Sequence, residues 1–189
     1  MIVTNKLKPI LLVSQNLTKH LSLPQDTVLR INLAWVNTRR DLIEILSKHK
    51  SHQIFLDLPT KRVKPPNNKY TLDELKPIFK KYKNIKYFAI SNVESAHDIN
   101  NLKKFIPSHI SIVPKIESIK AIMNIKEIIT SLDKDDPIIM LDHDDLFSSI
   151  IKANEPITNF KKYIQNLITF CKKHKIRLLR ARGIIFSEE

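Results

Sequence analysis

Two carboxylates and a lysine stand at the ends of apolar runs in the second half of the chain. Lys115 and Glu117 close one run, and Asp145 follows a second run that ends at Leu141. Carboxylate oxygens suit Mg²⁺ and Mn²⁺, and a site with only one or two protein carboxylates leaves coordination positions for water and an anionic substrate. The pattern predicts an enzyme that uses Mg²⁺ or Mn²⁺, with Glu117 and Asp145 as the metal ligands.

Length and composition restrict the class of protein. The chain has 189 residues, of which 42% are hydrophobic, enough for the core of a single domain over residues 1–189. Its single glycine, Gly183, excludes glycine-rich phosphate loops and dinucleotide-binding fingerprints, which need several. The lone Cys171 lies among apolar residues at helical spacing and is interpreted as a buried structural thiol. Because no membrane span or secretory leader is recognisable, we expect a cytoplasmic protein with no membrane partner.

A net charge of +13 favours anionic partners. These include a small phosphate or carboxylate substrate and nucleic acid, and the sign of the charge does not choose between them. The alternative is that the many lysines merely solvate helix faces. The charge therefore restricts the partner without naming it.

Short apolar runs alternate with amphipathic segments, which is typical of strand–helix units around a parallel sheet. We predict helices with apolar residues three and four apart near 42–46, 75–82, 99–105, 122–129 and 160–171. Thr71 with Glu74 has the spacing of a capping box, and Thr38, Ser95 and Thr158 are candidate N-caps. The predicted strands are residues 10–13, 28–33, 53–58, 87–91, 110–115, 137–141 and 177–181.

Seven or eight such units predict an α/β fold of the triosephosphate-isomerase barrel type, here incomplete with about seven units. Chemistry in that fold sits after the carboxyl ends of the strands. Residues two apart share a strand face, so Arg30 with Asn32, and Lys115 with Glu117, are expected to point into one mouth. The polar residues at successive strand ends are Arg30, Asn32, Asp57, Ser91, Lys115, Glu117 and Asp145.

The order of these segments resembles the pyruvate kinase family over nearly the whole chain. The matching segments are Leu29-Arg-Ile-Asn-Leu33, Phe55-Leu-Asp-Leu-Pro59, Phe88-Ala-Ile-Ser-Asn-Val93, Ile112-Val-Pro-Lys-Ile-Glu117 and Ile139-Met-Leu-Asp-His-Asp-Asp-Leu146.

The resemblance implies specific roles in binding pyruvate or phosphoenolpyruvate. Glu117 and Asp145 would bind the divalent metal that chelates this substrate. Lys115 would stabilise the enolate oxygen or the transferring phosphoryl group, and Arg30 would hold a phosphate or carboxylate. Asn32 and Asp57 fall where the family binds a monovalent cation such as K⁺, and Ser91 and Asp144 fall beside the substrate.

Several positions depart from the family pattern. The lid domain that would follow Asp57 is absent, which argues against ATP-forming phosphoryl transfer. An eighth strand and the C-terminal regulatory domain of the family are not recognisable either, so the resemblance is to a truncated relative. Asp144 stands where the family has a glycine, and Ala181 stands where it has a threonine. Ala34 and Leu58 replace hydroxyl-bearing residues, so K⁺ dependence is expected to be weakened or lost.

His143 lies beside the predicted site and is a candidate general acid or base near neutral pH. A solvent-facing loop position is the alternative for this histidine. The missing strand would leave an unpaired sheet edge. We therefore expect a homo-oligomer, either a dimer joined through the last strand or a barrel whose gap is closed by residues 184–187.

Three functions remain open from the sequence. The first is a metal-dependent enzyme that acts on the enolate of pyruvate, phosphoenolpyruvate or a related oxo-acid, more in the manner of a lyase than of a phosphotransferase. The second is a catalytically degenerate relative that binds a partner or a small anion. The third is nucleic-acid binding through the basic, acid-free segment 156–187, although its first lysines lie on what reads as a solvated helix face.

Overall fold

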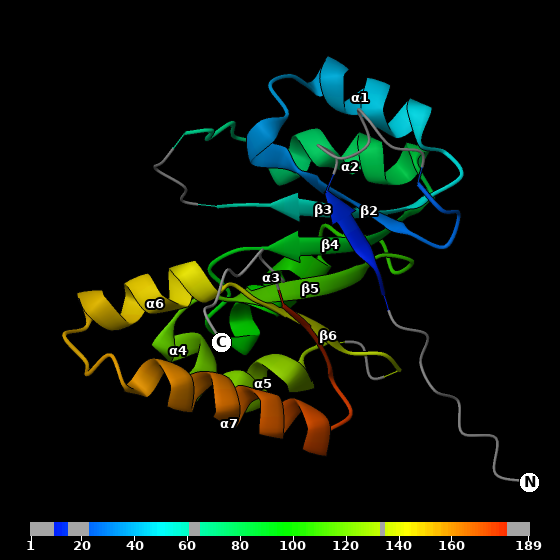
Figure 1. Cartoon of the computed structure of the whole chain (residues 1–189). Coiled ribbons are helices and arrows are strands. Elements are labelled where there is room, and N and C mark those ends of the chain that lie inside the picture. Colours follow the sequence, from blue (N-terminus) through cyan, green and yellow to red (C-terminus); the bar gives the residue numbers. More distant parts are fainter. Residues whose placement is uncertain (1–9, 15–22, 61–64, 133–134, 181–189) are drawn as a thin grey trace, which may run out of the picture.

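The chain forms an α/β structure around one parallel sheet in a computed structural model, which describes residues 10–14, 23–60, 65–132 and 135–180. Seven strands pair in the order in which they follow along the sequence, and every pairing is parallel. Figure 1 shows this succession. The strands are β1 (Leu12–Ser14), β2 (Val28–Asn32), β3 (Gln53–Leu58), β4 (Ile85–Ile90), β5 (Ser111–Ile116), β6 (Ile138–Leu141) and β7 (Arg177–Arg180).

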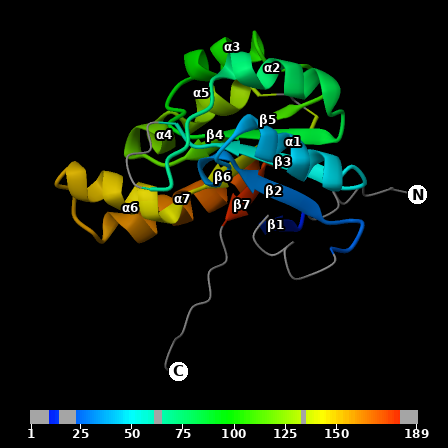
Figure 2. The same cartoon turned by 90° about the horizontal axis from the view of Figure 1, so that it is seen from above.

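Helices follow the strands and cover the outer side of the sheet (Figure 2). A sequential parallel order requires each connection to cross over one face, and helices fill the crossovers from β2 to β7. None of the described helices is long and apolar enough to cross a membrane. The helices are the 3₁₀ turn η2 (Leu33–Trp35), α1 (Arg39–Lys48), α2 (Leu72–Lys81), α3 (Ala96–Lys103), α4 (Ile119–Met123), α5 (Ile125–Thr130), α6 (His143–Lys152) and α7 (Asn159–Lys173).

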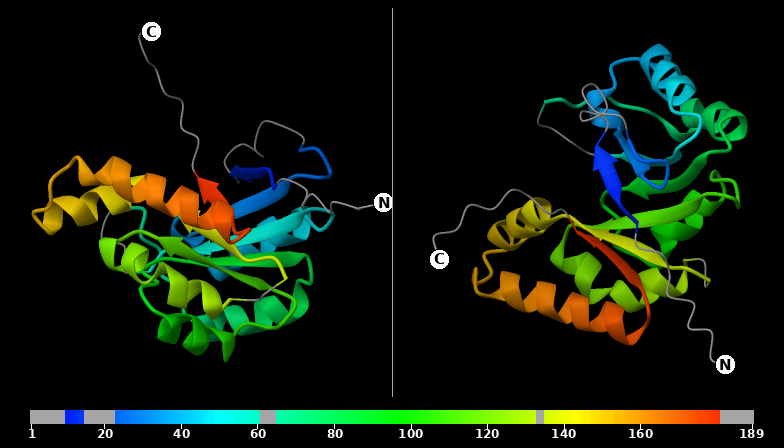
Figure 3. Two further views of the ribbon diagram at one scale, coloured as in Figure 1. Left: turned by 90° about the horizontal axis from the view of Figure 1, so that it is seen from below. Right: turned by 45° about the vertical axis from the view of Figure 1, so that its right-hand side comes forward.

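The sheet curls into a half-barrel with β1 and β7 at its two edges (Figure 3). Within the described ranges no backbone ladder joins β1 to β7. This arrangement is compatible with an incomplete β/α barrel. The dimer expected from an open edge stays a prediction, and the closing segment 184–187, like Ala181 and Gly183, lies outside the described residues.

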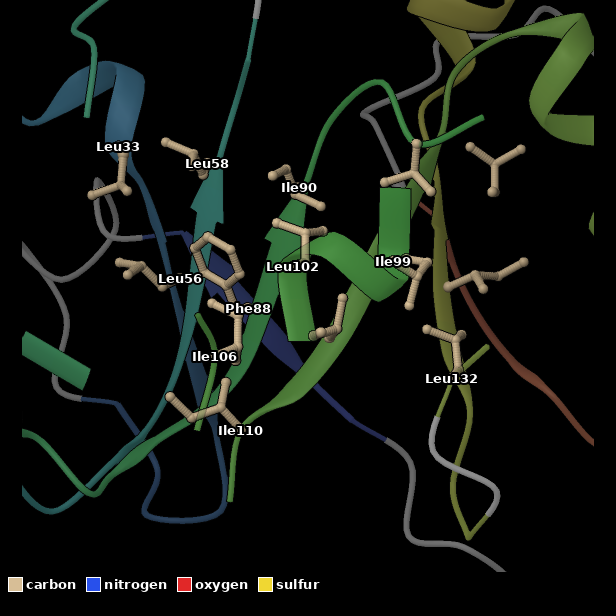
Figure 4. Packing of buried hydrophobic residues seen from close by; sticks show 14 of the residues in the cluster. Leu33, Leu56, Leu58, Phe88, Ile90, Ile99, Leu102, Ile106, Ile110 and Leu132 are labelled. Atoms are coloured by element: carbon tan, nitrogen blue, oxygen red, sulfur yellow. The ribbon is translucent and has the colours of Figure 1, made fainter. Parts of the chain in front are cut away.

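Apolar side chains alternate between the two faces of the curled sheet. The larger core lies between the sheet and the helices, where Leu29 and Ile31 of β2 are fully buried. A smaller cluster, which includes Val28 and Phe55, fills the inner side. The period of two along each strand therefore aims polar residues of the same inner face at the mouth above this cluster. Figure 4 shows part of the outer core, with labelled residues Leu33, Leu56, Leu58, Phe88, Ile90, Ile99, Leu102, Ile106, Ile110 and Leu132.

The seven predicted strands are confirmed, with bounds that shift by two residues at most. Thr71 forms the expected capping box with Glu74, and Thr38 and Ser95 cap their helices in the same way. Thr158 occupies the N-cap position of α7 but makes no capping hydrogen bond through its side chain.

Two helical segments differ from the prediction. The stretch 122–129 is not one helix, because Asn124 interrupts it and donates a side-chain hydrogen bond to the carbonyl of Glu94. Helix α6 was missed altogether. Its first turn contains the acidic residues that the sequence placed on a loop after the sixth strand.

Cys171 is buried in α7, as predicted, and burial raises the pKa of its thiol to about 12. Only the thiolate is strongly nucleophilic, so this cysteine is expected to be inert in the folded protein. Ellman's reagent at neutral pH should release no thionitrobenzoate from the native chain and one equivalent after denaturation in guanidinium chloride. Rapid labelling of the native protein would show that Cys171 is accessible.

Candidate metal centre

A cavity of about 590 Å³ opens at the carboxyl ends of the central strands. Six of the seven polar residues predicted at the strand ends line it, and the seventh, Asp57, binds one of them. The sequence therefore placed the cavity on the correct end of the sheet. The lining residues are Arg30, Asn32, Pro59, Thr60, Ser91, Asn92, Lys115, Glu117, Ser118, Asp142, Asp145, Ser148, Ser149 and Lys152.

The geometry of β5 and β6 brings the carboxylates of Glu117 and Asp142 together. Lys115 lies on β5 and Glu117 directly follows that strand, so both point to the inner side. Leu141 of β6 is in register with Ile116, and the amide of Asp142 extends this pairing with a hydrogen bond of 3.2 Å to the carbonyl of Ile116. The chain thus leaves β6 with Asp142 beside Glu117.

Three carboxylates form a cluster that can hold a metal ion. Glu117, Asp142 and Asp145 each offer one oxygen, and these oxygens lie within 4.8 Å of one another. Asp142 is the N-cap of α6 and accepts a hydrogen bond of 3.4 Å from the amide of Asp145, which fixes the two residues relative to each other. An all-oxygen donor set with an open side suits Mg²⁺ or Mn²⁺.

Lys115 places its ammonium group directly against this cluster. Its Nζ lies 2.7 Å from Oε1 of Glu117 and 3.4 Å from Oδ2 of Asp142, and it donates a hydrogen bond of 3.1 Å to Oγ of Ser91. Burial alone would lower the pKa of Lys115, but the charges of Asp57, Glu117 and Asp142 outweigh burial and raise it. Lys115 is therefore a fixed ammonium at neutral pH, which argues against a Schiff-base role.

Glu117 is the most enclosed carboxylate of the cluster. One oxygen faces Lys115, and the other accepts a hydrogen bond of 2.8 Å from the amide of Asn92. Burial raises the pKa of Glu117, and the ammonium of Lys115 and the amide of Asn92 offset this only in part. A cation that binds here replaces solvation that the buried carboxylate lacks.

Arg30 and Asp57 form an ion pair across β2 and β3. The Nε of Arg30 donates a hydrogen bond of 3.0 Å to Asp57, whose side chain is fully buried. Arg30 lines the cavity, and its expected role in binding an anion there stays a prediction. The amide oxygen of Asn32 caps η2 by accepting from the amide of Ala34, so Asn32 and Asp57 both have protein partners where a monovalent cation was expected. We propose no K⁺ site at these residues.

Two predicted site residues lie away from the cavity. Asp144 is exposed in the first turn of α6, and the ring of His143 packs against Phe160 of α7 at a centroid distance of 6.4 Å. Neither lines the cavity in the described structure, so the geometry supports no substrate contact for Asp144 and no catalytic role for His143. Both residues lie in the first turn of α6, where successive side chains point about 100° apart, so they face away from the side of the helix that lines the cavity.

Sequence reasoning missed Asp142 and Lys152 as residues of the cavity. Asp142 carried one available signal, since an Asp three residues before Asp145 at the end of an apolar run is a typical helix N-cap. Recognition of that cap would have predicted α6. Lys152, at the other end of α6, would then have followed from the helical repeat.

The fold and the carboxylate cluster together define an α/β half-barrel with a candidate metal centre. No family model matches the chain, and no curated protein matches its sequence. Among solved structures, the chain resembles RipC from Yersinia pestis with a TM-score of 0.58 and 15% sequence identity, over 84% of this chain and 71% of RipC. At this identity the likeness concerns the fold alone.

These comparisons overturn the resemblance to pyruvate kinase. A solved structure that the chain resembles is that of RipC, and no family model supports the motif match on which the resemblance relied. The matched segments are mainly buried strands followed by polar residues, a pattern that parallel β/α folds of different families share. The roles proposed below therefore rest on the geometry of this site.

Proposed function

We propose that this chain is a divalent-metal-dependent enzyme that acts on a small 2-oxo acid through its enolate, at the carboxyl ends of an incomplete β/α barrel. The observation that carries the proposal is the cluster of Glu117, Asp142 and Asp145 beside the buried ammonium of Lys115. This arrangement combines an oxygen donor set for a hard cation with a fixed positive charge at the same point.

The chemistry follows from where negative charge develops. When the bond from C3 of a 2-oxo acid to a proton breaks, the proton passes to solvent, the electron pair of that bond moves into the C2–C3 bond and charge gathers on the C2 oxygen. When a bond from C3 to a hydroxyl-bearing carbon breaks instead, that carbon leaves as a carbonyl after its hydroxyl proton passes to solvent, and the same enolate forms. Mg²⁺ or Mn²⁺ bound to Glu117, Asp142 and Asp145 would supply Lewis acidity toward that oxygen. Lys115 donates a hydrogen bond to the same oxygen, and Ser91 holds the ammonium in place. A proton that returns to C3 completes the cycle.

Reaction type is restricted by what the chain lacks in sequence. A single glycine leaves no glycine-rich loop to cradle nucleotide phosphates. Carbon–carbon bond cleavage, or another simple reaction of an oxo-acid enolate, therefore fits this site better than ATP-forming phosphoryl transfer. A cytoplasmic location and a homo-oligomeric state stay predictions.

Enolate stabilisation can be measured before the natural substrate is known. We expect the protein with Mg²⁺ to accelerate exchange of the methyl protons of pyruvate with D₂O, followed by proton NMR. The rate should fall to that of the Mg²⁺ blank when EDTA is added. A protein that binds Mn²⁺ and pyruvate but gives no exchange above the blank would support the second function, a degenerate enzyme that only binds its ligand.

Nucleic-acid binding has less support from the site. The basic residues Lys161, Lys162, Lys172 and Lys173 are exposed on α7, as expected for the solvated face of an amphipathic helix whose other face buries Leu167 and Cys171. The phenylalanine and tyrosine rings of α7 are half-buried, and the exposed ring of His174 packs against Phe170 at a centroid distance of 4.4 Å, so these rings offer little free face for base stacking.

A further inference from the structure

One face of α6 forms a wall of the cavity. Asp145, Ser148, Ser149 and Lys152 all line it, and their spacing of three and four residues places them on the same side of the helix. Asp145 belongs to the metal cluster, and Lys152 lies about 10 Å further along the helix axis. Helical side chains lean toward the N-terminus, so the lysine stem reaches back over the cavity toward the metal end.

Lys152 is an exposed residue of the cavity wall and differs from the other cations there in having no partner among the described residues. Arg30 binds Asp57, and Lys115 binds Glu117 and Asp142. In the described part of the chain, no hydrogen bond or ion pair engages Lys152. A position in the last turn of α6 is favourable for any lysine. That preference does not explain why this one faces the cavity.

The hydroxyl groups of Ser148 and Ser149, which lie between Asp145 and Lys152 on α6, already have hydrogen-bond partners. Ser148 donates its proton to the carbonyl of Asp144, and Ser149 accepts from the amide of Ile119. They form a neutral stretch between the carboxylate cluster and Lys152. The wall thus offers a carboxylate of the candidate metal centre at one end and a single positive charge at the other.

The cavity is also larger than a three-carbon oxo-acid needs. Ligand pockets of about 300–1,000 Å³ enclose drug-sized molecules, and this cavity measures about 590 Å³. A pyruvate bound at the carboxylate cluster would leave the Lys152 end to water. A longer acid would reach it.

We propose that the substrate is a 2-oxo acid with a second carboxylate, and that Lys152 is the specificity-determining residue that binds this distal group. The inference rests on the proposed function, because the oxo-acid end must be held by the metal centre. The ammonium of one lysine supplies a single positive charge, which suits one carboxylate better than a phosphate.

The test uses two ligands that differ only at the distal end. 2-Oxoglutarate carries a carboxylate where 2-oxopentanoate carries a methyl group, and both have five carbons. Calorimetry in saturating Mn²⁺ should show that the wild-type protein binds 2-oxoglutarate about ten- to a hundredfold more tightly, as for a hydrogen bond to a charged group. Lys152→Met should remove this preference and leave the affinity for 2-oxopentanoate as it was, whereas Lys152→Arg should keep the preference.

The control is Lys126→Met, which removes an exposed lysine of α5 that does not line the cavity. It should leave both affinities unchanged. Equal affinities of the wild-type protein for the two acids, or equal losses for both in Lys152→Met, would overturn the inference while the proposed function stands. Failure of the wild-type protein to bind Mn²⁺ or either acid would overturn both.

Discussion

Replacement of Glu117 by glutamine is expected to weaken Mn²⁺ binding by at least about 10²-fold, beyond the 10- to 100-fold typical of losing a group that merely orients a metal ligand. Glu117 is the buried member of the carboxylate cluster and faces Asp142 and Asp145. Glutamine keeps the shape and can still accept the hydrogen bond from Asn92, so the fold is retained while the ligand loses its charge. Electron paramagnetic resonance of free Mn²⁺ measures the affinity directly.

Asp144→Asn provides a matched control for this variant. Asp144 lies one residue before Asp145 in the first turn of α6, but it is exposed and does not line the cavity. It should bind Mn²⁺ like the wild-type protein. A Glu117→Gln protein with unchanged affinity, or an equal loss in both variants, would show that the ion is attracted by the general negative charge of this helix end and not held by the cluster.

The parts of the site that lie on strands could be predicted from the sequence. Strand side chains alternate with a period of two, so the pairs Arg30 with Asn32 and Lys115 with Glu117 had to share the inner face once the strands were located. The cavity contains both pairs. Their common location depends only on the parallel direction of β2 and β5, which the alternation of apolar runs and helices already indicated.

The parts that depend on α6 could not be placed in the same way. Three aspartates lie within four positions, 142, 144 and 145, and composition alone does not tell which of them face the cavity. The choice is made by the hydrogen bond from the amide of Asp142 to the carbonyl of Ile116, a contact between distant segments. Helix α6 then begins at His143 with Asp142 as its N-cap, and the helical twist places Asp145 on the side that lines the cavity and Asp144 away from it.

The ion pair of Arg30 and Asp57 is a second contact between distant segments that the sequence alone did not predict. Each residue was predicted at a strand end, with separate anion and cation partners. The parallel register of β2 and β3 pairs Asn32 with Asp57 and brings the guanidinium of Arg30 over the buried carboxylate. A buried carboxylate requires such a partner, so the register and not the residue type decides what Asp57 binds.

Replacement of Lys115 by methionine is expected to change metal binding and catalysis in opposite directions. In the described structure the ammonium lies 2.7 Å from Glu117 and 3.4 Å from Asp142, so it occupies the same carboxylates that a divalent ion would bind. Without this competing charge, Mn²⁺ should bind about tenfold more tightly or better. The exchange of pyruvate protons should fall by about 10²-fold or more, because a charged donor to the enolate oxygen is lost.

Stability provides an independent measure of the same competition. Without metal, Lys115→Met leaves the buried Glu117 and Asp57 without their nearest ammonium, a loss of about 3–5 kcal/mol for a broken buried pair. Saturating Mg²⁺ should restore much of this stability, so the rise in Tm on adding Mg²⁺ should be larger in the variant than in the wild-type protein. Lys120→Met, which breaks an exposed ion pair with Glu94, should show the wild-type rise. If Lys115→Met instead weakened Mn²⁺ binding, Lys115 would be supporting the metal ligands, and the assignment of these carboxylates to both an ammonium and a metal would be wrong.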